Sequence, residues 1–547
     1  MSLFFKSGAR SGAVENRAGV LLYELAAEAG FPINMPCGGS GTCRRCMVLL
    51  GAGAYRIAGK KVTVAAGETL EARACKTEML YDDAVIHIPA TSLFNAGMYV
   101  DSGFNCAVDF IPEENKTGFG VAVDIGTTTV AVLLVELSTG NILAKQSQYN
   151  QQIELGDNVA TRIALCADET NIKKLQQLVI NETVAPLIDA LIEQSKINPA
   201  GIAEIVFSGN TVMSHLALGL SALSIGVIPF EPLTKIFRDC TAPEIGLICV
   251  PNAVVKTVPA ISGYVGGDIV SDLFVAGLSK QKLELLVDIG TNGELVLNDH
   301  GKLYATATAA GPAFEGAGLL HGGRADTGMI EKIICTAGDV IEYKTIDDAA
   351  PRGLCGSAVV DFIATAFKTG LLNPMGRFDR DRLRAAGKYV DLDCHGINVI
   401  ACVIASPESS ATGEAVLITE YDVSQILKAK AAIYAGIRTL LGECGYAPEN
   451  IDRLILAGGF AAHLDLGNAI TLGMLPEIPL EQYDVIGNGS LAGAYAALGA
   501  PGIWSTFKEI SCGPKAFHLA ETDEFDNRFV DALAIPNLDP AEFSFTL

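Results

Sequence analysis

The sequence predicts a small α+β domain that a linker joins to a larger α/β domain with two related halves. Near the N-terminus, short alternating segments surround a loop rich in cysteine and glycine. The string Val-Asp-Ile-Gly-Thr occurs twice, beginning at Val123 and at Val287, each time between two strand-like apolar runs. From residue 119 onward such runs alternate with amphipathic helical segments, which is typical of the α/β class.

The composition is that of a globular protein with several domains. Of the 547 residues, 50% are hydrophobic and 18% are charged, so the chain can bury large cores and is neither disordered nor a coiled coil. The formal net charge is −23 at pH 7, and this negative field repels nucleic acids and anionic membrane surfaces. We therefore expect neither nucleic acid nor a membrane among the partners.

The N-terminal residues do not have the pattern of a secretory signal peptide. They lack an apolar run of about 7–15 residues followed by a small-residue cleavage site, so we expect a cytoplasmic protein. Residues 205–230 contain no Asp, Glu, Lys or Arg, but polar residues and glycines interrupt them. In lipid these would leave polar groups without partners. This stretch is therefore predicted to be a buried strand, a turn and a helix.

Residues 1–92 are predicted to form the small α+β domain. Residues 21–30 place leucines at helical spacing and end in a glycine, a common residue just after a helix. Alternating apolar runs predict short strands at residues 47–50, 61–65 and 84–88. No periodicity holds between residues 93 and 118, where glycine, proline and glutamate occur, so we expect a linker there.

Four cysteines of the small domain have the spacing of a metal-binding loop; they are Cys37, Cys43, Cys46 and Cys75. Thiolates are the ligands of iron–sulfur clusters, and the glycines between the first two cysteines let the backbone fold closely around such a cluster. Zinc is the alternative, but zinc sites favour two Cys-x2-Cys pairs, and only Cys43 and Cys46 form one. The other cysteines are scattered, and most are expected to be small core residues.

The loop PCGGSGTCRRC, with ARACK further along, resembles the cluster loop of adrenodoxin-like ferredoxins. The resemblance covers residues 1–92. It implies a β-grasp ferredoxin domain that carries one 2Fe-2S cluster and transfers single electrons. By this resemblance the cluster ligands are Cys37, Cys43, Cys46 and Cys75.

The larger domain is predicted to consist of a first half, 119–284, and a second half, 285–520. An acidic tail at 521–547 is expected to pack loosely or to wrap around a neighbouring molecule. Each half opens with a strand, a polar turn and a second strand. Apolar residues at steps of three and four predict long amphipathic helices at residues 171–197 and 422–441.

The two repeated turns contain the residue types that phosphate binding requires. Asp124 and Asp288 each end a predicted strand, where a carboxylate can hold the water shell of Mg²⁺ or the attacking water. Gly126 and Gly290 allow the backbone to approach a phosphate. Neutral hydrogen-bond donors follow in both turns, at Thr127, Thr128, Thr291 and Asn292.

A third glycine turn follows a predicted strand at 454–457, in LILAGGFAAHLDLGNAI, and its glycines are predicted to open a helix. With the two Asp-x-Gly-Thr turns it resembles the phosphate and adenosine motifs of the superfamily of acetate and sugar kinases, heat-shock protein 70 and actin (ASKHA). The resemblance spans about residues 119–515 and implies an actin-like, ribonuclease H-like ATPase with two lobes, a hinge and Mg²⁺. The residues assigned to the nucleotide are Gly126, Thr127, Thr128, Thr129, Gly290, Thr291, Asn292, Gly458, Gly459 and Phe460.

Other segments are less specific. Asp268, in GYVGGDIVSD, is a third candidate catalytic carboxylate beside Asp124 and Asp288, with a helix cap as its alternative role. His215 is expected to be a core histidine rather than a base. Residues 308–318 predict a functional glycine-rich loop without an assigned ligand, and 352–362 predict a helix N-terminus that can bind an anion.

Over its whole length the chain resembles the ATP-dependent reductive activators of corrinoid proteins. The motifs that carry the resemblance are PCGGSGTCRRC, VDIGTTTVAV, SGNTVMSHL, VDIGTNGEL, AAGPAFEGA, GLCGSAVVD, ILAGGF and GNGSLAGA. The resemblance implies ATP-driven, one-electron reduction of Co(II) to Co(I) in a corrinoid protein, which supports corrinoid-dependent methyl transfer such as O-demethylation. It implies as partners that corrinoid protein, a low-potential donor such as ferredoxin or flavodoxin, and a second copy in a homodimer. Because the linker leads directly into the first phosphate turn, we expect no separate middle domain of the kind found in longer relatives.

Two other functions share part of this pattern. An activator of 2-hydroxyacyl-CoA dehydratases uses ATP with a 4Fe-4S cluster shared between subunits, and the four cysteines within one N-terminal domain argue against it. In the other alternative, the actin-like domain is a non-catalytic scaffold and the ferredoxin domain is a docking module. That alternative predicts that no corrinoid protein stimulates ATP hydrolysis.

Overall fold

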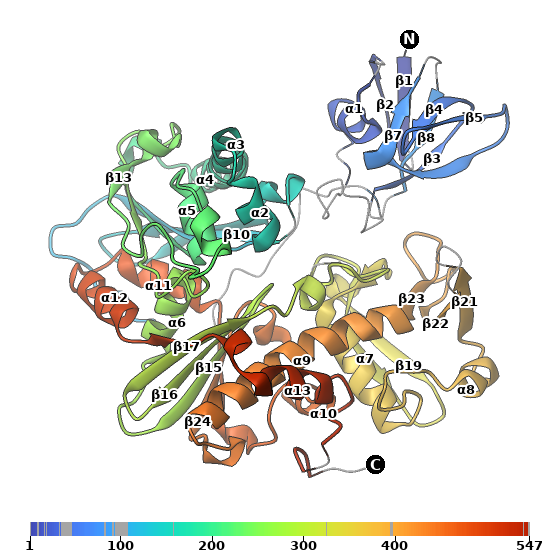
Figure 1. Ribbon diagram of the computed structural model, residues 1–547. Helices are drawn as coiled ribbons and strands as arrows, with labels where there is room; N and C mark the ends of the chain where they lie inside the picture. The colour runs from blue at the N-terminus through green and yellow to red at the C-terminus, as the bar shows by residue number, and fades with distance from the viewer. Residues whose placement is uncertain are drawn as a thin grey trace. The chain divides into compact units, whose positions relative to one another are not determined.

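The computed structural model describes residues 2–7, 10–15, 17, 19–31, 33, 46–80, 84–89, 92, 108–156, 158–323, 325–393, 398–539 and 541–544. The chain forms two units, whose elements are labelled in Figure 1. The first unit consists of Met1–Met98 with Gln151–Arg162, and the second of Tyr99–Asn150 with Ile163–Leu547. Of the predicted cluster ligands, Cys37 and Cys43 lie outside the described residues.

A five-stranded mixed sheet is the framework of the first unit. Its strand order is β2-β1-β8-β3-β6, with β1 parallel to β8 and the other neighbours antiparallel, and a smaller sheet has the order β5-β4-β7. Helix α1 buries Leu22, Leu25 and Ala26, which recur on one helical face. The predicted α+β domain is confirmed. Its elements are β1 (Ser2–Ser7), β2 (Arg10–Glu15), α1 (Leu22–Glu28), β3 (Met47–Leu50), β4 (Gly53–Ile57), β5 (Lys60–Val64), β6 (Leu70–Arg73), β7 (Thr77–Met79) and β8 (Ala84–His87).

The second unit opens with a sheet in the order β11-β10-β9-β12-β14-β13. Strands β9, β10 and β11 form an antiparallel meander, and β12 is parallel to both β9 and β14. Strand β9 is buried on both faces, which explains its continuous apolar run. The strands are β9 (Phe119–Ile125), β10 (Thr129–Glu136), β11 (Ile142–Tyr149), β12 (Ile202–Gly209), β13 (Cys240–Thr241) and β14 (Val254–Thr257).

The helices of this first half include the amphipathic helix predicted at 171–197. It is present as α3 and α4, joined by a π-helical turn at Ile180–Val184. Residues 205–230 contain the end of β12 and the short helix α5, as predicted, and no helix of the described chain is long and apolar enough to cross a membrane. The helices are α2 (Val159–Leu165), α3 (Glu169–Val179), α4 (Ala185–Ser195), α5 (Thr211–Ala217) and α6 (Gly267–Ala276).

The second sheet repeats the first. Strands β15, β16 and β17 form an antiparallel meander, and β24 and β25 follow as parallel strands, in the order β25-β24-β15-β16-β17-β26. Asp124 and Asp288 therefore lie at equivalent places, near the ends of β9 and β15. The predicted repeat is confirmed as a repeat of the fold. The strands are β15 (Leu283–Ile289), β16 (Gly293–Asp299), β17 (Lys302–Thr308), β24 (Arg453–Ala457), β25 (Tyr483–Gly487) and β26 (Lys515–Ala516).

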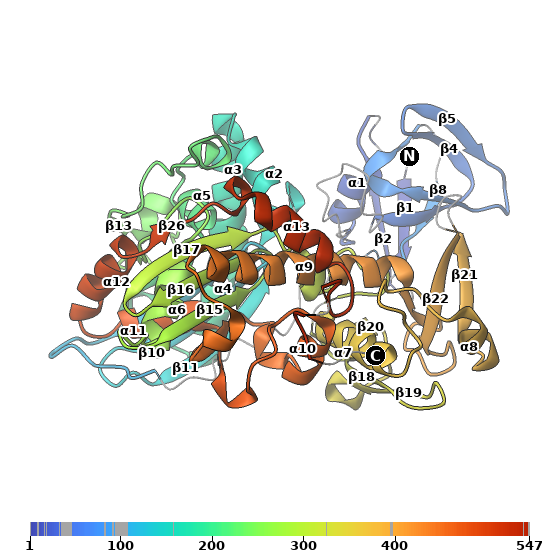
Figure 2. The ribbon, with the colours of Figure 1, turned by 60° about the horizontal axis from the view of Figure 1, so that its bottom comes forward.

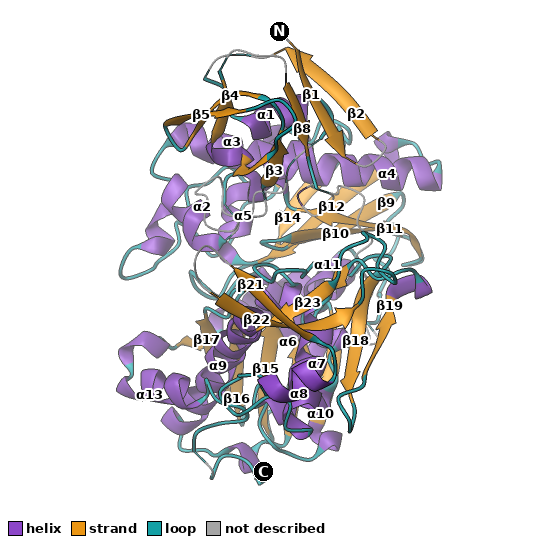
Figure 3. Cartoon of the chain, turned by 90° about the vertical axis from the view of Figure 1, so that its right-hand side faces the viewer, coloured by secondary structure: helices purple, strands orange, loops and turns teal. Residues whose placement is uncertain are grey.

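Two helices connect the halves. Helix α11 (Gly489–Ala497) comes late in the chain but packs against β9 and β12 of the first half and against α6. Figures 1 and 3 show α6 and α11 between the two sheets, and one hydrophobic cluster contains residues of both sheets and both helices. At Gly493 of α11 a Cβ atom would lie 2.4 Å from Cβ of Ser271 on α6, so the two helices touch closely. Helix α11 of the second half thus forms part of the packing of the first half.

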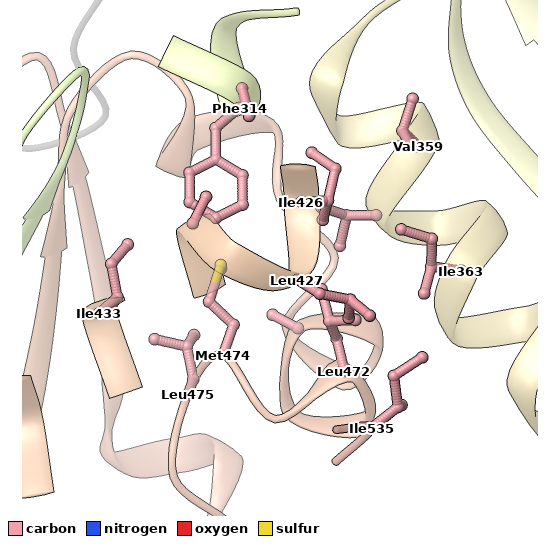
Figure 4. Close-up of a cluster of buried hydrophobic side chains, with 14 of the residues drawn as sticks. Phe314, Val359, Ile363, Ile426, Leu427, Ile433, Leu472, Met474, Leu475 and Ile535 are labelled. Atoms are coloured by element: carbon pink, nitrogen blue, oxygen red, sulfur yellow. The ribbon is translucent and has the colours of Figure 1, made fainter. Parts of the chain in front are cut away.

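Further elements enlarge the second half. Helix α9 (Glu420–Glu443), predicted at 422–441, runs in Figure 2 from the sheet of β16 and β17 to that of β22 and β23. Figure 4 shows Ile426 and Leu427 of α9 facing Val359 and Ile363 of α7 and Leu472 of α10 in one core. The remaining elements are β18 (Met329–Cys335), β19 (Ile341–Thr345), β20 (Gly353–Leu354), α7 (Gly356–Lys368), α8 (Arg380–Ala385), β21 (Tyr389–Asp393), β22 (Asn398–Ala405), β23 (Val416–Thr419), α10 (Leu466–Leu472), α12 (Gly502–Cys512) and α13 (Asp523–Asp531).

The C-terminal segment is packed, so the expectation of a loose tail at 521–547 is wrong for its described residues. Helix α13 lies against α9. The fully buried Nζ of Lys430 on α9 donates hydrogen bonds to the carbonyl oxygens of Ala534 and Pro536 at 2.6 and 2.7 Å. A buried polar group requires such partners. The tail sequence is acidic, yet it contributes to the second-half core through Phe543.

Phe543→Ala should lower the stability of the second unit. Phe543 is 5% exposed, and its ring centroid lies 5.3 Å from that of Tyr434. Removing a buried aromatic ring costs about 3 kcal/mol. The urea midpoint, followed by circular dichroism, should fall accordingly. Leu538→Ala, at a residue 52% exposed, is the matched control and should stay within about 0.5 kcal/mol of wild type. Equal midpoints for both variants would mean that the tail packs loosely.

Candidate functional site

A cavity of about 1490 Å³ lies between the two halves of the second unit. Both Asp-x-Gly-Thr turns, the glycine turn after β24 and the first residues of α6, α7 and α11 line it. The structure thus gathers every residue predicted for catalysis and nucleotide binding. These are Asp124, Gly126, Thr127, Thr128, Thr129, Asp268, Asp288, Gly290, Thr291, Asn292, Gly458, Gly459 and Phe460.

The two repeated turns are joined by hydrogen bonds. The hydroxyl oxygens of Thr128 and Thr291 lie 2.9 Å apart, and Thr291 donates to Oε1 of Glu315 at 2.9 Å. Since the Thr291 hydrogen is used for Glu315, Thr128 is the donor to Thr291. Asn210, which caps α5, donates to the Thr127 hydroxyl at 3.0 Å. The two repeated turns, one from each half, are therefore held in contact.

Asp124 accepts two hydrogen bonds from the start of α11. Asn488 Nδ2 lies 2.9 Å from one carboxylate oxygen, and Ser490 Oγ lies 2.7 Å from the other. Ser490 Oγ is also 2.9 Å from Oγ of Ser208, the register partner of Asp124 on β12. The Ser490 hydroxyl donates to Asp124, and the Ser208 hydroxyl donates to the carbonyl oxygen of Gly267 at 3.2 Å.

The third glycine turn approaches Asp288 very closely. Gly458 has φ of +96°, and a Cβ there would lie 2.6 Å from Asp288 Oδ1 and from the carbonyl oxygen of Ile289. Only glycine fits this position. The prediction that a helix begins at Gly458 and Gly459 is wrong. A single 3-10 turn follows at Ala461–His463, and regular helix begins only with α10.

An apolar region of the cavity adjoins this turn. The rings of Phe460 and Phe314 are stacked, with centroids 5.0 Å apart and planes inclined by 23°. Leu464, Leu466 and Leu480 line the same cavity. A half-exposed aromatic face beside aliphatic side chains is suited to a planar heterocycle such as a purine.

Ten of the described carboxylates line the cavity, and six of them are close enough for their charges to affect one another's pKa: Asp124, Asp268, Asp272, Asp288, Glu294 and Glu315. Burial, reinforced by neighbouring carboxylates, raises the pKa of Asp268 to about 7 and that of Asp288 to about 8. The same causes raise the pKa of Asp272 and Glu294 well above the ordinary range. Burial also raises the pKa of Asp124, while the hydrogen bonds from Ser490 and Asn488 oppose this.

The region of these six carboxylates fits a cation that arrives together with an anionic ligand. Oδ2 of Asp272 is buried without a hydrogen-bond partner among the described residues. Lys332 and His463 are the only basic side chains among the described residues that line the cavity. Within the described chain no three His, Cys, Asp or Glu side chains are gathered closely enough to hold a metal ion by themselves. Mg²⁺ usually takes one or two carboxylates, several waters and substrate phosphates, which suits this arrangement.

Two predicted cluster ligands are neighbours in the first unit. The sulfur atoms of Cys46 and Cys75 lie 3.2 Å apart, farther than the roughly 2.05 Å of a disulfide bond, and both residues are buried. Cys46 precedes β3, and Cys75 lies in a 3-10 turn after β6. A backbone hydrogen bond of 2.8 Å from Ala74 to Cys46 holds the two segments together. Two thiols placed in this way fit a shared iron–sulfur cluster.

The remaining predictions have mixed outcomes. His215 is a core residue, as expected; it is fully buried, and its Nδ1 lies 2.7 Å from the Thr211 carbonyl oxygen. Asp268 accepts a hydrogen bond from the Ile269 N–H and lines the cavity, so it has features of both roles considered for it. Helix α7 begins at residue 356, as the segment 352–362 predicts, and its first two residues line the same cavity.

Five residues that line the cavity were not predicted from the sequence: Asp272, Glu294, Glu315, Asn488 and Ser490. Asp272 follows Asp268 by four residues in a helical segment, a spacing that places both on one helix face and could have revealed it. Asn488 and Ser490 follow a short apolar strand in a glycine turn, which is the pattern of the other phosphate turns. Nothing in the sequence shows that they reach Asp124.

Comparison with known families gives two matches that together cover most of the chain. A family model described as the RACo middle region matches residues 119–281, and one described as the C-terminal domain of RACo, the ASKHA domain, matches residues 282–546. The expectation that a middle domain is missing is therefore wrong. The region called the middle region in that family is the first half of the second unit.

Individual proteins are similar over long stretches. The corrinoid activation enzyme RamQ of Eubacterium limosum is 31% identical in an alignment 532 positions long that covers 87% of this chain and 89% of RamQ. A [Co(II) methylated amine-specific corrinoid protein] reductase of Methanosarcina barkeri is 23% identical over 68% of each chain. The solved structure of a reductive activator for a corrinoid, iron-sulfur protein covers 99% of both chains with a TM-score of 0.74 and 28% identity.

Asp288→Asn should remove part of the pH dependence of stability in metal-free buffer. The folded-state pKa of Asp288 is about 8, above its ordinary value, so the stability linked to this group is full at low pH and is lost as the pH rises through 8. Asparagine cannot ionise and keeps the shape. Thermal unfolding with a chelator present should therefore show the variant melting above wild type at pH 9, with the gap closing toward pH 5. A gap that does not depend on pH would contradict the assignment.

Proposed function

The protein belongs to the RACo family of reductive activators of corrinoid proteins, and we propose that it uses ATP to reduce the cobalt of a corrinoid protein from Co(II) to Co(I). The observation that carries the proposal is the contact between the two phosphate turns. Thr128 and Thr291, one from each half, lie within one hydrogen bond in the cavity that all predicted nucleotide residues line. A nucleotide bound there would touch both halves at once.

The carboxylates of the cavity have distinct proposed roles. Asp124 accepts from Asn488 and Ser490, which favours its ionised form, and we assign it to the water shell of Mg²⁺. Burial beside other carboxylates raises the pKa of Asp288 to about 8, and a bound Mg²⁺ would favour its ionised form, which could then accept a proton from the attacking water. Asp268 lines the same region and orients either the ion or the water. Mg²⁺, when bound, would neutralise the phosphates, which few basic side chains approach.

The nucleotide would use the remaining predicted residues. The backbone at Gly126 and Gly290 and the side chains of Thr127, Thr128, Thr129, Thr291 and Asn292 would hold the phosphates. Gly458, Gly459 and Phe460 would contact the adenosine. The stacked pair of Phe460 and Phe314 supports this placement, because both residues line the cavity and their rings lie nearly parallel.

A 2Fe-2S cluster held by Cys37, Cys43, Cys46 and Cys75 is the proposed electron carrier. When bound, such a cluster passes single electrons. The proximity of the Cys46 and Cys75 sulfurs supports this ligand set. The proposed donor is a ferredoxin or flavodoxin, the proposed acceptor is the corrinoid protein, and the proposed assembly is a cytoplasmic homodimer.

ATP is needed if the electron must travel toward a lower potential. For a one-electron couple, each ~59 mV uphill makes the product tenfold less favoured, about 1.4 kcal/mol. Closure of the two halves around ATP would offset this by favouring one docked geometry of the acceptor. Binding energy from the nucleotide is thereby coupled to electron transfer.

Mixing the anaerobically reduced protein with a Co(II) corrinoid protein should yield Co(I) only when Mg-ATP is present. The visible spectrum distinguishes the two cobalt states directly. Co(I) formed equally well without ATP would contradict the coupling. If several corrinoid proteins give no Co(I) while ATP is hydrolysed, the acceptor belongs to another class, such as a 2-hydroxyacyl-CoA dehydratase. If neither ATP turnover nor Co(I) formation responds to a corrinoid protein, the scaffold alternative gains support.

Two variants should separate the two cofactors. Cys43→Ser should abolish electron transfer and leave nucleotide binding intact, because the cluster and the ATP cavity use different parts of the chain. Cys512→Ser, at an exposed cysteine of α12, is the matched control and should behave as wild type. Asp288→Ala should lose ATP hydrolysis and keep the visible absorption of the cluster. Loss of nucleotide binding in Cys43→Ser, or loss of the cluster absorption in Asp288→Ala, would refute the assignment of the two cofactors to separate sites.

A further inference from the structure

The linker between the two domains is fastened to one end of helix α11. The ring of Phe110 lies 5.2 Å from that of Tyr495, near the end of α11, and Tyr495 donates a hydrogen bond of 2.7 Å to the carbonyl oxygen of Gly140. Gly140 sits in the turn between β10 and β11, and a Cβ there would lie 2.5 Å from the Phe110 ring. Phe110 thus fills the space between α11 and the first sheet.

Lys116 makes a second attachment a few residues later. Its ammonium donates to the carbonyl oxygen of Leu498 at 3.0 Å and pairs with Glu204 of β12 at 2.6 Å. Glu204 is 5% exposed, so this ion pair is shielded from water. At Gly499 a Cβ would lie 2.6 Å from the carbonyl oxygen of Ile111, so the linker backbone runs directly against the end of α11.

The other end of α11 holds the nucleotide site. Asn488 and Ser490, at its first turn, donate to the two carboxylate oxygens of Asp124. The nine residues of Gly489–Ala497 span only about 14 Å at 1.5 Å per residue. One short helix therefore touches the phosphate turn at its start and the linker at its end.

Close packing along α11 leaves the helix little room to bend. At Gly489 a Cβ would lie 2.2 Å from Asp272 Oδ1, and the contact of Gly493 with Ser271 on α6 is similarly tight. Interiors packed in this way transmit displacements because they contain no free volume to absorb them. A shift of the first turn must therefore appear at the last turn.

We propose that α11 transmits the state of the nucleotide site to the linker, with Asn488 and Ser490 as positioning residues for Asp124 and with Phe110 and Lys116 as anchors of the linker. The inference rests on the proposed ATP site. A Mg²⁺ ion and phosphates that engage the Asp124 carboxylate compete with the Asn488 and Ser490 hydrogen bonds or draw their donors along. The first turn of α11 then moves, and the linker follows.

Hydrogen exchange of the full chain, with and without the unhydrolysable analogue Mg-AMPPNP, tests this directly. In wild type the analogue should change the exchange of the amides at 108–118 at least twofold, together with protection of the amides at 121–129. Phe110→Ala and Lys116→Met should keep the response at 121–129 and lose that at 108–118. Phe525→Ala, which removes a half-buried ring tilted against that of Phe529 on α13, is the matched control and should respond as wild type.

Two outcomes would overturn the proposal in distinguishable ways. Protection at 121–129 without any change at 108–118 in wild type would refute the coupling while leaving the ATP site intact. No protection at 121–129 would refute the ATP site and, with it, the signal that α11 carries. As a functional readout, Phe110→Ala should hydrolyse ATP within twofold of wild type, yet ATP should no longer accelerate Co(I) formation. A normal ATP-dependent rate in both linker variants would also overturn the proposal.

Discussion

Ten carboxylates of the described residues line one cavity that contains little positive charge, and they impose the dominant electrostatic constraint on the second unit. Buried carboxyl groups this close together cannot all be ionised, so some of them hold a proton. The raised pKa values of Asp268 and Asp288 reflect this. A ligand that brings its own cation satisfies the same groups in their ionised form. This explains why the phosphate turns contain threonine and glycine rather than lysine, and why metal and nucleotide are expected to bind together.

Helix α11, which comes from the second half and packs on the first, connects the two halves beside this cavity. Because α11 follows the second sheet in the chain yet packs on β9 and β12, the two halves cannot move without moving its contacts. Its start holds Asp124, and its end holds Phe110 of the linker. The same helix therefore lies between the proposed site of ATP hydrolysis and the segment that leads to the proposed electron carrier.

Local patterns predicted a large part of this architecture. The helices α1 and α9 and the two Asp-x-Gly-Thr turns were found from periodicity and repetition, because each depends on residues close together in the chain. The nucleotide residues assigned by resemblance all line one cavity. The wrong expectation for the C-terminal segment has a physical origin in contacts between distant residues. The buried Lys430, which binds the C-terminal segment, looks like an ordinary charged residue of a helix until its partners more than 100 positions away are known.

The sequence by itself determined which chemistry the protein carries: paired phosphate turns, a cysteine loop and an order of segments that resembles one family. Only the tertiary structure decided which side chains meet. Asn488 and Asp124 are 364 positions apart, and no periodicity links them. Their hydrogen bond exists because burial of apolar faces packs β9 and α11 together. Apolar burial is non-directional, so neither segment contains a sequence pattern that identifies its partner.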